Sequence, residues 1–130
     1  MILMDTDVCV ELLRGNKSVI EHRRNVADDI AVSFMTAGEL FYGAERSSRP
    51  AHNRILVERF LLSVLYLQSN RTIMQKFGTL KADLADRGEL LPDADILVAA
   101  TALSHCELLV SGNTAHFSRF AGLKVEDWAK

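Results

Sequence analysis

Short apolar runs alternate with longer amphipathic segments along this chain. The runs are bounded by polar or turn-forming residues, and continuous apolar runs of this length are typical of strands buried on both faces. They predict strands over residues 2–4, 30–34, 64–67 and 107–111, and an edge strand over 123–125. Helical periodicity predicts helices over 6–13, 18–25, 36–47, 72–87 and 92–106, one following Pro50, and a short helix following Asn113.

This alternation of strands and helices determines the expected fold class. Strands separated by helices form a parallel sheet with helices on both faces, so the chain is expected to be an α/β protein. A length of 130 residues is that of one domain, spanning 1–130. In such sheets the ligand site lies beyond the carboxyl ends of the strands, at a topological switch point.

Several acids stand where helices are expected to begin. Thr36 and Glu39 have the spacing of a capping box, and Thr6 or Asp7 has the position of a cap for the first helix, with Asp5 at the strand end as an alternative cap. Asp93 and Asp95 lie at the entrance of the apolar segment "ILVAATAL", where a carboxylate acts either as a cap or as a ligand. A capping role therefore stays open for each of these residues.

Three of the acids are expected to converge. Asp5 ends the first strand, Glu39 lies in the helix that follows the second strand, and Asp95 opens the apolar helix. Three carboxylates in one cleft repel each other unless a cation lies among them. Oxygen ligands favour Mg²⁺ or Mn²⁺, and such a site activates water and neutralises phosphate charge. The pattern therefore indicates phosphate chemistry.

Composition narrows the class of protein. Hydrophobic residues make up 48% and charged residues 25%, and the formal net charge is −2, which does not by itself indicate nucleic-acid binding. Cys9 and Cys106 lie in apolar stretches and are expected to be buried reduced thiols. No signal peptide and no run of membrane-spanning length is visible, so a cytoplasmic protein is expected.

The histidines and the aromatic residues Phe117, Phe120 and Trp128 are expected to have structural rather than catalytic roles. The four histidines are scattered, and only His116 lies near the candidate site, where it is interpreted as a surface residue rather than a catalyst. Phe117 and Phe120 are expected to anchor their segment to the core, and Trp128 to anchor the tail.

Four segments in order carry a resemblance to a known family. "MDTDVCVELLRG", "TAGELFYGAERS", "LPDADILVAATAL" and "LLVSGNTAHFSRFAGLKVEDW" span nearly the whole chain. Together they resemble PIN-domain ribonucleases and, more narrowly, the VapC toxins of toxin–antitoxin pairs. The resemblance implies an α/β/α sandwich with a central, mostly parallel sheet of four to five short strands. It also implies an endoribonuclease that depends on Mg²⁺ or Mn²⁺.

The resemblance assigns the catalytic and metal-binding acids. The first family aspartate falls on Asp5, and the family glutamate falls on Glu39 of "ELFYGA". The third acid heads "DILVAA" and falls on Asp95. These three residues are therefore expected to hold the metal ion and carry catalysis.

Supporting residues follow from the same resemblance. The fourth family position falls on Asn113, whose amide adds no charge, and Ser111 replaces a threonine that orients the first aspartate. Asp7 stands where the family usually has asparagine, and Asp93 is a second additional acid. Whether these two acids bind metal or cap helices, and whether one or two ions bind, stays open.

Substrate and partners are also implied. Basic residues that could hold an RNA backbone include Arg14, Lys17, Arg46 and Arg49, for which an ordinary solvated face is the alternative. The resemblance implies a homodimer and a cognate VapB-type antitoxin. The segment "RFLLSVLYL" has more apolar surface than one core helix and strand require, so part of it is expected at an interface.

Two alternatives start from the same residues. An Asp-x-Asp pair after a strand also resembles the haloacid dehalogenase phosphatases, but Val8 and Cys9 stand where that family usually has Gly-Thr. The second alternative is a binding module that keeps the PIN fold with little catalysis, which the uncharged Asn113 makes conceivable.

Overall fold

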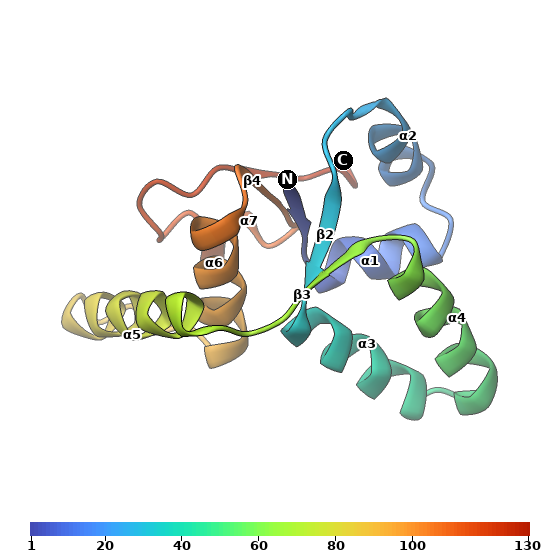
Figure 1. The fold of residues 1–130 in the computed structure, drawn as a ribbon, viewed down its shortest axis with the longest axis horizontal. Helices are drawn as coiled ribbons and strands as arrows, with labels where there is room; N and C mark the ends of the chain where they lie inside the picture. The colour runs from blue at the N-terminus through green and yellow to red at the C-terminus, as the bar shows by residue number, and fades with distance from the viewer.

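A computed structural model describes residues 1–130 and contains one five-stranded parallel sheet (Figure 1). The strand order is β3-β2-β1-β4-β5. The strands are β1 (Ile2–Met4), β2 (Ile30–Ser33), β3 (Leu65–Leu67), β4 (Leu108–Val110) and β5 (Val125–Glu126). The predicted α/β class and parallel sheet are confirmed, and every strand lies within about two residues of its expected range.

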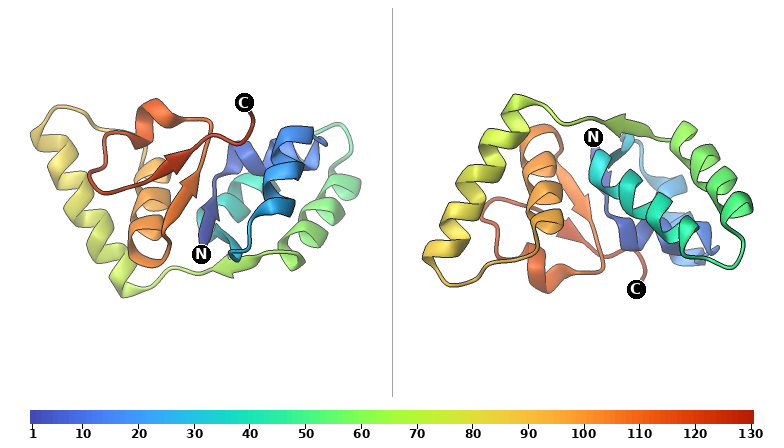
Figure 2. Two further views of the ribbon diagram at one scale, coloured as in Figure 1. Left: turned by 90° about the horizontal axis from the view of Figure 1, so that it is seen from above. Right: turned by 90° about the horizontal axis from the view of Figure 1, so that it is seen from below.

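Seven helices surround this sheet. They are α1 (Thr6–Leu13), α2 (Lys17–Asn25), α3 (Phe34–Glu45), α4 (Pro50–Leu62), α5 (Arg71–Asp86), α6 (Asp93–His105) and α7 (Thr114–Phe117). Figures 1 and 2 show α1 to α4 gathered on one side of the sheet and α5 to α7 on the other. None of them is both long and apolar enough to cross a membrane.

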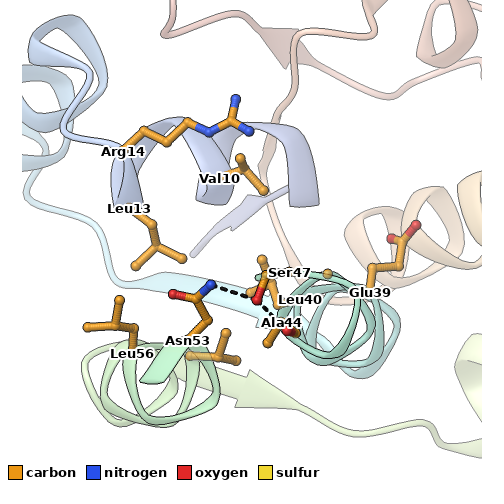
Figure 3. A pocket seen from close by; sticks show the side chains of 11 residues that line it. Val10, Leu13, Arg14, Glu39, Leu40, Ala44, Ser47, Asn53 and Leu56 are labelled. Atoms are coloured by element: carbon orange, nitrogen blue, oxygen red, sulfur yellow. Dashed lines mark hydrogen bonds between the residues drawn. The ribbon is translucent and has the colours of Figure 1, made fainter. Parts of the chain in front are cut away.

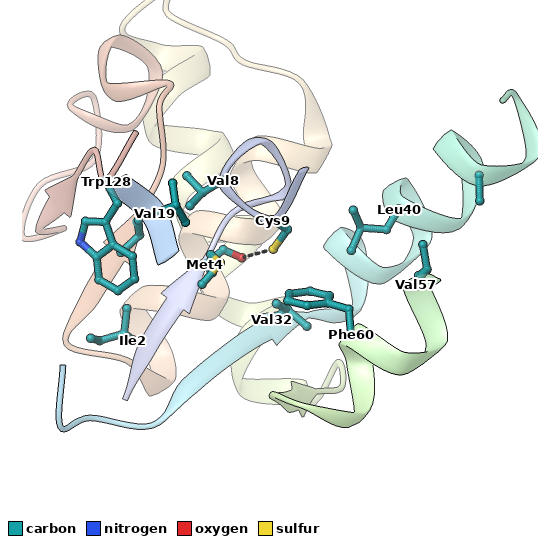
Figure 4. Close-up of a cluster of buried hydrophobic side chains, with 12 residues drawn as sticks. Ile2, Met4, Val8, Cys9, Val19, Val32, Leu40, Val57, Phe60 and Trp128 are labelled. Carbon is teal, nitrogen blue, oxygen red and sulfur yellow. Dashed lines mark hydrogen bonds between the residues drawn. The ribbon is translucent and has the colours of Figure 1, made fainter. Parts of the chain in front are cut away.

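Alternation along the strands feeds two separate cores. In β1, Ile2 and Met4 contribute to the core under α1 to α4, whereas Leu3 contributes to the core under α5 to α7. Successive strand side chains point to opposite faces, so a strand buried on both faces must be apolar throughout. Figure 4 shows the first core, in which Phe60 of α4 and Trp128 also lie.

The order of the strands creates a switch point at β1. The chain leaves β1 for β2 and β3 on one side, and then returns to place β4 and β5 on the other. Residues that follow β1, β2 and β4 therefore meet at one edge of the sheet. Helix α6 precedes β4 and runs back along the sheet, so its first turn lies at the same edge.

The structure decides among the capping alternatives. Ser33 caps α3 by accepting a hydrogen bond from the Thr36 backbone N–H at 3.2 Å, so Thr36 lies inside the helix and forms no capping box. The cap of α1 is Asp5, whose Oδ1 accepts from the Thr6 N–H at 2.9 Å. Helix α6 has no side-chain cap, which removes that role from its first-turn acids.

The expected anchors and thiols are buried as predicted, with one exception. Phe117, Phe120 and Trp128 lie in the two cores. Cys9 is fully buried, and its Sγ lies 3.8 Å from the Met4 carbonyl oxygen (Figure 4). The exception is Cys106, which is free but only partly buried.

Candidate active site

Asp5 is the central acid of the site. It follows β1 directly, and its carboxylate is buried at the switch point of the sheet, with 9% of the residue exposed. Its Oδ1 accepts from the Thr6 N–H and its Oδ2 accepts from the Ser111 hydroxyl, each at 2.9 Å. The end of β1 and the end of β4 therefore hold this carboxylate from two sides.

The surroundings of Asp5 disfavour its charged form. Burial, together with the charges of Asp7 and Asp95, raises the pKa of Asp5 to about 6, although the hydrogen bonds from Thr6 and Ser111 lower it. Binding of a cation is favourable at a buried acid with two acidic neighbours, because the cation offsets the repulsion between the carboxylates.

Glu39 reaches the same region through Thr6. Its Oε1 accepts from the Thr6 hydroxyl at 2.8 Å, and the Thr6 hydroxyl also lies 3.0 Å from the Thr36 hydroxyl oxygen. Since the Thr6 backbone N–H binds Asp5, one threonine at the start of α1 contacts both acids. Glu39 is thus directed toward the site, with its Oε2 left without a hydrogen-bond partner in the protein.

Asp95 is held by residues that follow β4. The His116 Nδ1 lies 2.8 Å from Asp95 Oδ2, and the Asn113 side-chain Nδ2 lies 2.8 Å from the same ring nitrogen. The Asn113 backbone N–H donates to the Ser111 hydroxyl at 2.9 Å, which links this group to Asp5. His116 is partly exposed, with its side chain 36% accessible, but the surface interpretation did not anticipate its contact with a candidate ligand.

The two additional acids point elsewhere. Asp93 forms an exposed ion pair with Lys81 at 2.9 Å. Asp7 accepts from the Gly112 N–H at 2.9 Å and from the Val8 N–H at 2.8 Å, so it ties α1 to the loop after β4. Desolvation raises the pKa of Asp7 against these hydrogen bonds. Neither residue has a direct contact with another candidate acid.

A continuous hydrogen-bonded chain joins the three catalytic candidates. In order, it runs through Glu39, Thr6, Asp5, Ser111, Asn113, His116 and Asp95. The acids surround the end of β1 without enclosing a common point, since no three His, Cys, Asp or Glu side chains form a metal-binding cluster.

The available donor atoms fit a hard cation. Asp5, Glu39 and Asp95 offer only carboxylate oxygens, and one oxygen each of Glu39 and Asp95 has no protein hydrogen bond. Mg²⁺ and Mn²⁺ prefer such ligands and keep several waters, so three carboxylates suffice.

A pocket adjoins the site between α1, α3 and α4. It has a volume of about 380 Å³ and is lined mainly by apolar side chains, including Leu13, Leu40 and Leu56, with Glu39 and Arg14 also on its wall. In Figure 3 the Glu39 carboxylate points away from Asn53 and Leu56. Glu39 therefore connects this pocket with the acidic site.

The four basic candidates are all exposed. Arg14 ends α1, Lys17 begins α2, Arg46 ends α3, and Arg49 precedes α4. Only Arg14 lines the pocket that also contains Glu39. Arg14 therefore lines the same pocket as Glu39, and the other three candidates lie at helix ends outside it.

Sequence reasoning missed Thr6 and His116. The position of Thr6 could have predicted its role, because a threonine that directly follows a strand-end aspartate can direct its hydroxyl toward the same cleft. His116 lies in the short α7 that follows β4, and its contact with Asp95 depends on how α7 lies against α6. Only its nearness to Asn113 could have suggested a role.

Known proteins share this architecture over the full chain. The PIN domain family model matches residues 2–123. Ribonuclease VapC2 of Haemophilus influenzae is 35% identical over 97% of this chain and 96% of its own. The tRNA(fMet)-specific endonuclease VapC of Shigella flexneri is 30% identical over 98% and 97%.

A solved structure agrees with this sequence similarity. The crystal structure of VapBC2 from Rickettsia felis bound to a promoter DNA fragment contains a chain that superposes with a TM-score of 0.92. That chain is 26% identical, and the match covers 98% of this chain and 99% of the other. This chain therefore belongs to the PIN-domain family and, within it, to the VapC ribonuclease toxins of VapBC toxin–antitoxin pairs.

Proposed function

We propose that this VapC protein is an endoribonuclease that depends on Mg²⁺ or Mn²⁺ and uses Asp5, Glu39 and Asp95 as its metal-binding and catalytic acids. The observation that carries the proposal is the hydrogen-bonded chain that joins these acids at the switch point of the sheet. Asp5 is buried and its pKa is raised to about 6, so its charged form is the one that a bound cation would stabilise most.

Each residue has a defined part in hydrolysis of the phosphodiester bond. The bound cation supplies Lewis acidity toward the phosphoryl oxygen and a lowered pKa for the attacking water. Ser111 and the Thr6 N–H fix the Asp5 carboxylate, so that its remaining lone pairs face the cleft. Glu39 and Asp95 supply the other carboxylate oxygens from α3 and α6. Preorganised charge of this kind lowers the barrier to phosphoryl transfer.

Transfer RNA is the substrate class that the relatives support. The Shigella flexneri relative is a tRNA(fMet)-specific endonuclease by name and matches this chain over 98% of its length. Exposed Arg14, Arg46 and Arg49 lie at ends of the helices around the pocket, Lys17 begins the neighbouring α2, and together they carry the positive charge that an RNA backbone requires. Arg14 is the residue of this set that we place nearest the scissile phosphate, because it shares the pocket wall with Glu39.

The pocket between α1, α3 and α4 is the proposed seat of a VapB-type antitoxin. Its apolar lining, including half-exposed Leu13 and Leu56, suits an apolar side chain of the antitoxin. Glu39 at its end suits a basic side chain. Co-expression of Leu56→Glu with the product of the neighbouring reading frame is expected to abolish inhibition while RNA cleavage persists. Full inhibition of that variant would contradict this assignment.

A homodimer is proposed along α4, β3 and α5. This surface exposes Leu62 at 88%, Leu65 at 44%, Tyr66 at 46% and Met74 at 44%, and β3 is an edge strand. Apolar patches of this kind mark protein interfaces. Light scattering is expected to show a dimer that Leu62→Asp converts to a monomer, while Tyr42→Asp, at a residue 68% exposed on α3, leaves it intact. A dimer in both variants would refute this interface.

Paired substitutions on one helix turn test the catalytic proposal. Asp95→Asn is expected to reduce cleavage of fluorescent tRNA in Mg²⁺ by at least about 100-fold, a usual loss for a metal ligand or an adjacent group. Asp93→Asn is the matched control, because Asp93 only pairs with Lys81 in solvent. Equal cleavage by wild type and Asp95→Asn would refute the assignment. RNA binding without cleavage by the wild type would instead support the binding-module alternative.

A further inference from the structure

A histidine that the chemistry above does not use contacts one of the proposed ligands. His116 of α7 places Nδ1 at 2.8 Å from Asp95 Oδ2 of α6. The two side chains are 36% and 22% exposed. No other protein group donates to the Asp95 carboxylate, and α6 has no side-chain cap that could hold it.

The hydrogen bond has a definite direction. A carboxylate oxygen accepts, so the proton in this contact lies on Nδ1 of His116, which a neutral imidazole already provides. The Asn113 amide lies 2.8 Å from the same nitrogen and satisfies both contacts when it presents its carbonyl oxygen to the ring. One N–H then serves Asp95 and Asn113 together.

The backbone that carries His116 is fixed by its neighbour. Phe117 is fully buried in the core under α5 to α7 and lies 6.2 Å from Phe120, ring centroid to ring centroid. Its burial fixes the position of the short α7 against α6. The imidazole is therefore presented to Asp95 from a rigid position.

We infer that His116 is a positioning residue of the ribonuclease site. Its Nδ1–H holds Oδ2 of Asp95, which leaves Oδ1 free to face a cation. Hydrogen-bonded partners that orient metal ligands commonly change metal affinity or activity by about 10- to 100-fold when removed. This inference rests on the proposed function, because it concerns how Asp95 is presented to the metal ion.

Three substitutions separate positioning from direct chemistry. Asn places an amide N–H near the position of Nδ1, whereas Gln places one near Nε2. His116→Ala and His116→Gln are expected to weaken Mn²⁺ binding in calorimetry by about 10-fold and to lower kcat by a similar factor. The KM for tRNA is expected to change by less than about threefold. His116→Asn is expected to restore both metal binding and kcat.

Further variants make the result decisive. His52→Ala, at an exposed position of α4, is the matched control and is expected to behave as wild type. Wild-type Mn²⁺ affinity in His116→Ala would overturn the inference, and so would rescue by Gln without rescue by Asn, since Nε2 would then act on the substrate. Cleavage and Mn²⁺ binding unaffected by Asp5→Asn and Asp95→Asn would refute the proposed function itself, a result distinguishable from failure of the His116 inference alone.

Discussion

Replacing Asp5 by Asn is expected to stabilise the metal-free protein while it abolishes cleavage. The pKa of Asp5 is raised from its ordinary value of 3.8 to about 6, chiefly by burial. The folded protein therefore binds this proton more tightly than the unfolded chain does. Its free energy of unfolding falls as the pH rises from about 4 to about 6 and stays low above that range.

The magnitude follows from the two pKa values. A change from 3.8 to about 6 corresponds to about 3 kcal/mol of lost stability at pH 7.5. Asparagine removes the charge, but it keeps only one of the two hydrogen bonds from Thr6 and Ser111, which costs about 1 kcal/mol. The net gain is about 2 kcal/mol, or a rise in Tm of about 6 °C for a chain of this size.

Urea unfolding in EDTA at pH 4 and pH 7.5 measures this effect. Wild type is expected to lose stability between the two pH values relative to Asp5→Asn, and the two proteins are expected to be similar at pH 4. Added Mg²⁺ is expected to stabilise wild type at pH 7.5 and to leave Asp5→Asn unchanged. Asp93→Asn, whose carboxylate lies in solvent beside Lys81, controls for charge removal at this edge.

If Asp5→Asn were less stable than wild type at pH 7.5 in EDTA, burial of the charged carboxylate would not be the dominant cost at this position. The same conclusion would follow if both proteins showed one pH dependence.

Three further predictions concern other positions. Gly112→Ala places a Cβ 2.7 Å from the Asp7 Oδ2 and is expected to lower the free energy of unfolding by about 1 kcal/mol, measured by urea denaturation, through loss of the Gly112 N–H bond. Gly78→Ala, inside α5 with open space around it, is expected to raise that free energy by roughly 0.5–1 kcal/mol. Burial raises the pKa of the Cys9 thiol and raises the pKa of Cys106 to about 11, so a disulfide reagent at pH 8 is expected to label neither thiol rapidly until the protein is unfolded.

The strands could be predicted because their side chains are apolar on both faces. Ile2, Leu3 and Met4 supply two different cores, which is why three consecutive apolar residues mark a strand of a doubly covered sheet. At the edge, Leu65 and Tyr66 are exposed, so the same apolar signal there reflects a surface rather than a core.

The helix starts could not be predicted reliably, because several residues of one type compete for each cap. Ser33 and Thr36 are both good caps, and the choice depends on where β2 stops in the sheet. Asp5 and Asp7 compete in the same way, and the residue at the strand end becomes the cap. Local sequence contains the candidates but not the tertiary contact that selects among them.

The residues of the candidate site also differ in how well the sequence could predict them. The position of Asp5 at the candidate site was predictable from the rule that ligands bind at the carboxyl ends of parallel strands, and the position of Asp95 from an acid placed before an apolar helix. His116 was not, because its partner lies 21 residues away and the contact depends on the docking of a four-residue helix. Contacts between elements of this kind carry no periodic signal in the sequence.

The opposition between stability and function at Asp5 explains the arrangement around it. A carboxylate used to bind a cation must be partly desolvated, because water would otherwise compete with the ion and screen its charge. Desolvation favours the protonated form of Asp5, which is a poorer ligand for a cation, and the pKa of Asp5 is raised to about 6 even with its hydrogen bonds in place. The hydrogen bonds from Thr6 and Ser111 counter this by favouring the ionised form, and they also fix its orientation. These donors therefore stabilise part of the charge on Asp5. In our proposal the cation stabilises the rest, which couples metal binding and folding stability through one residue.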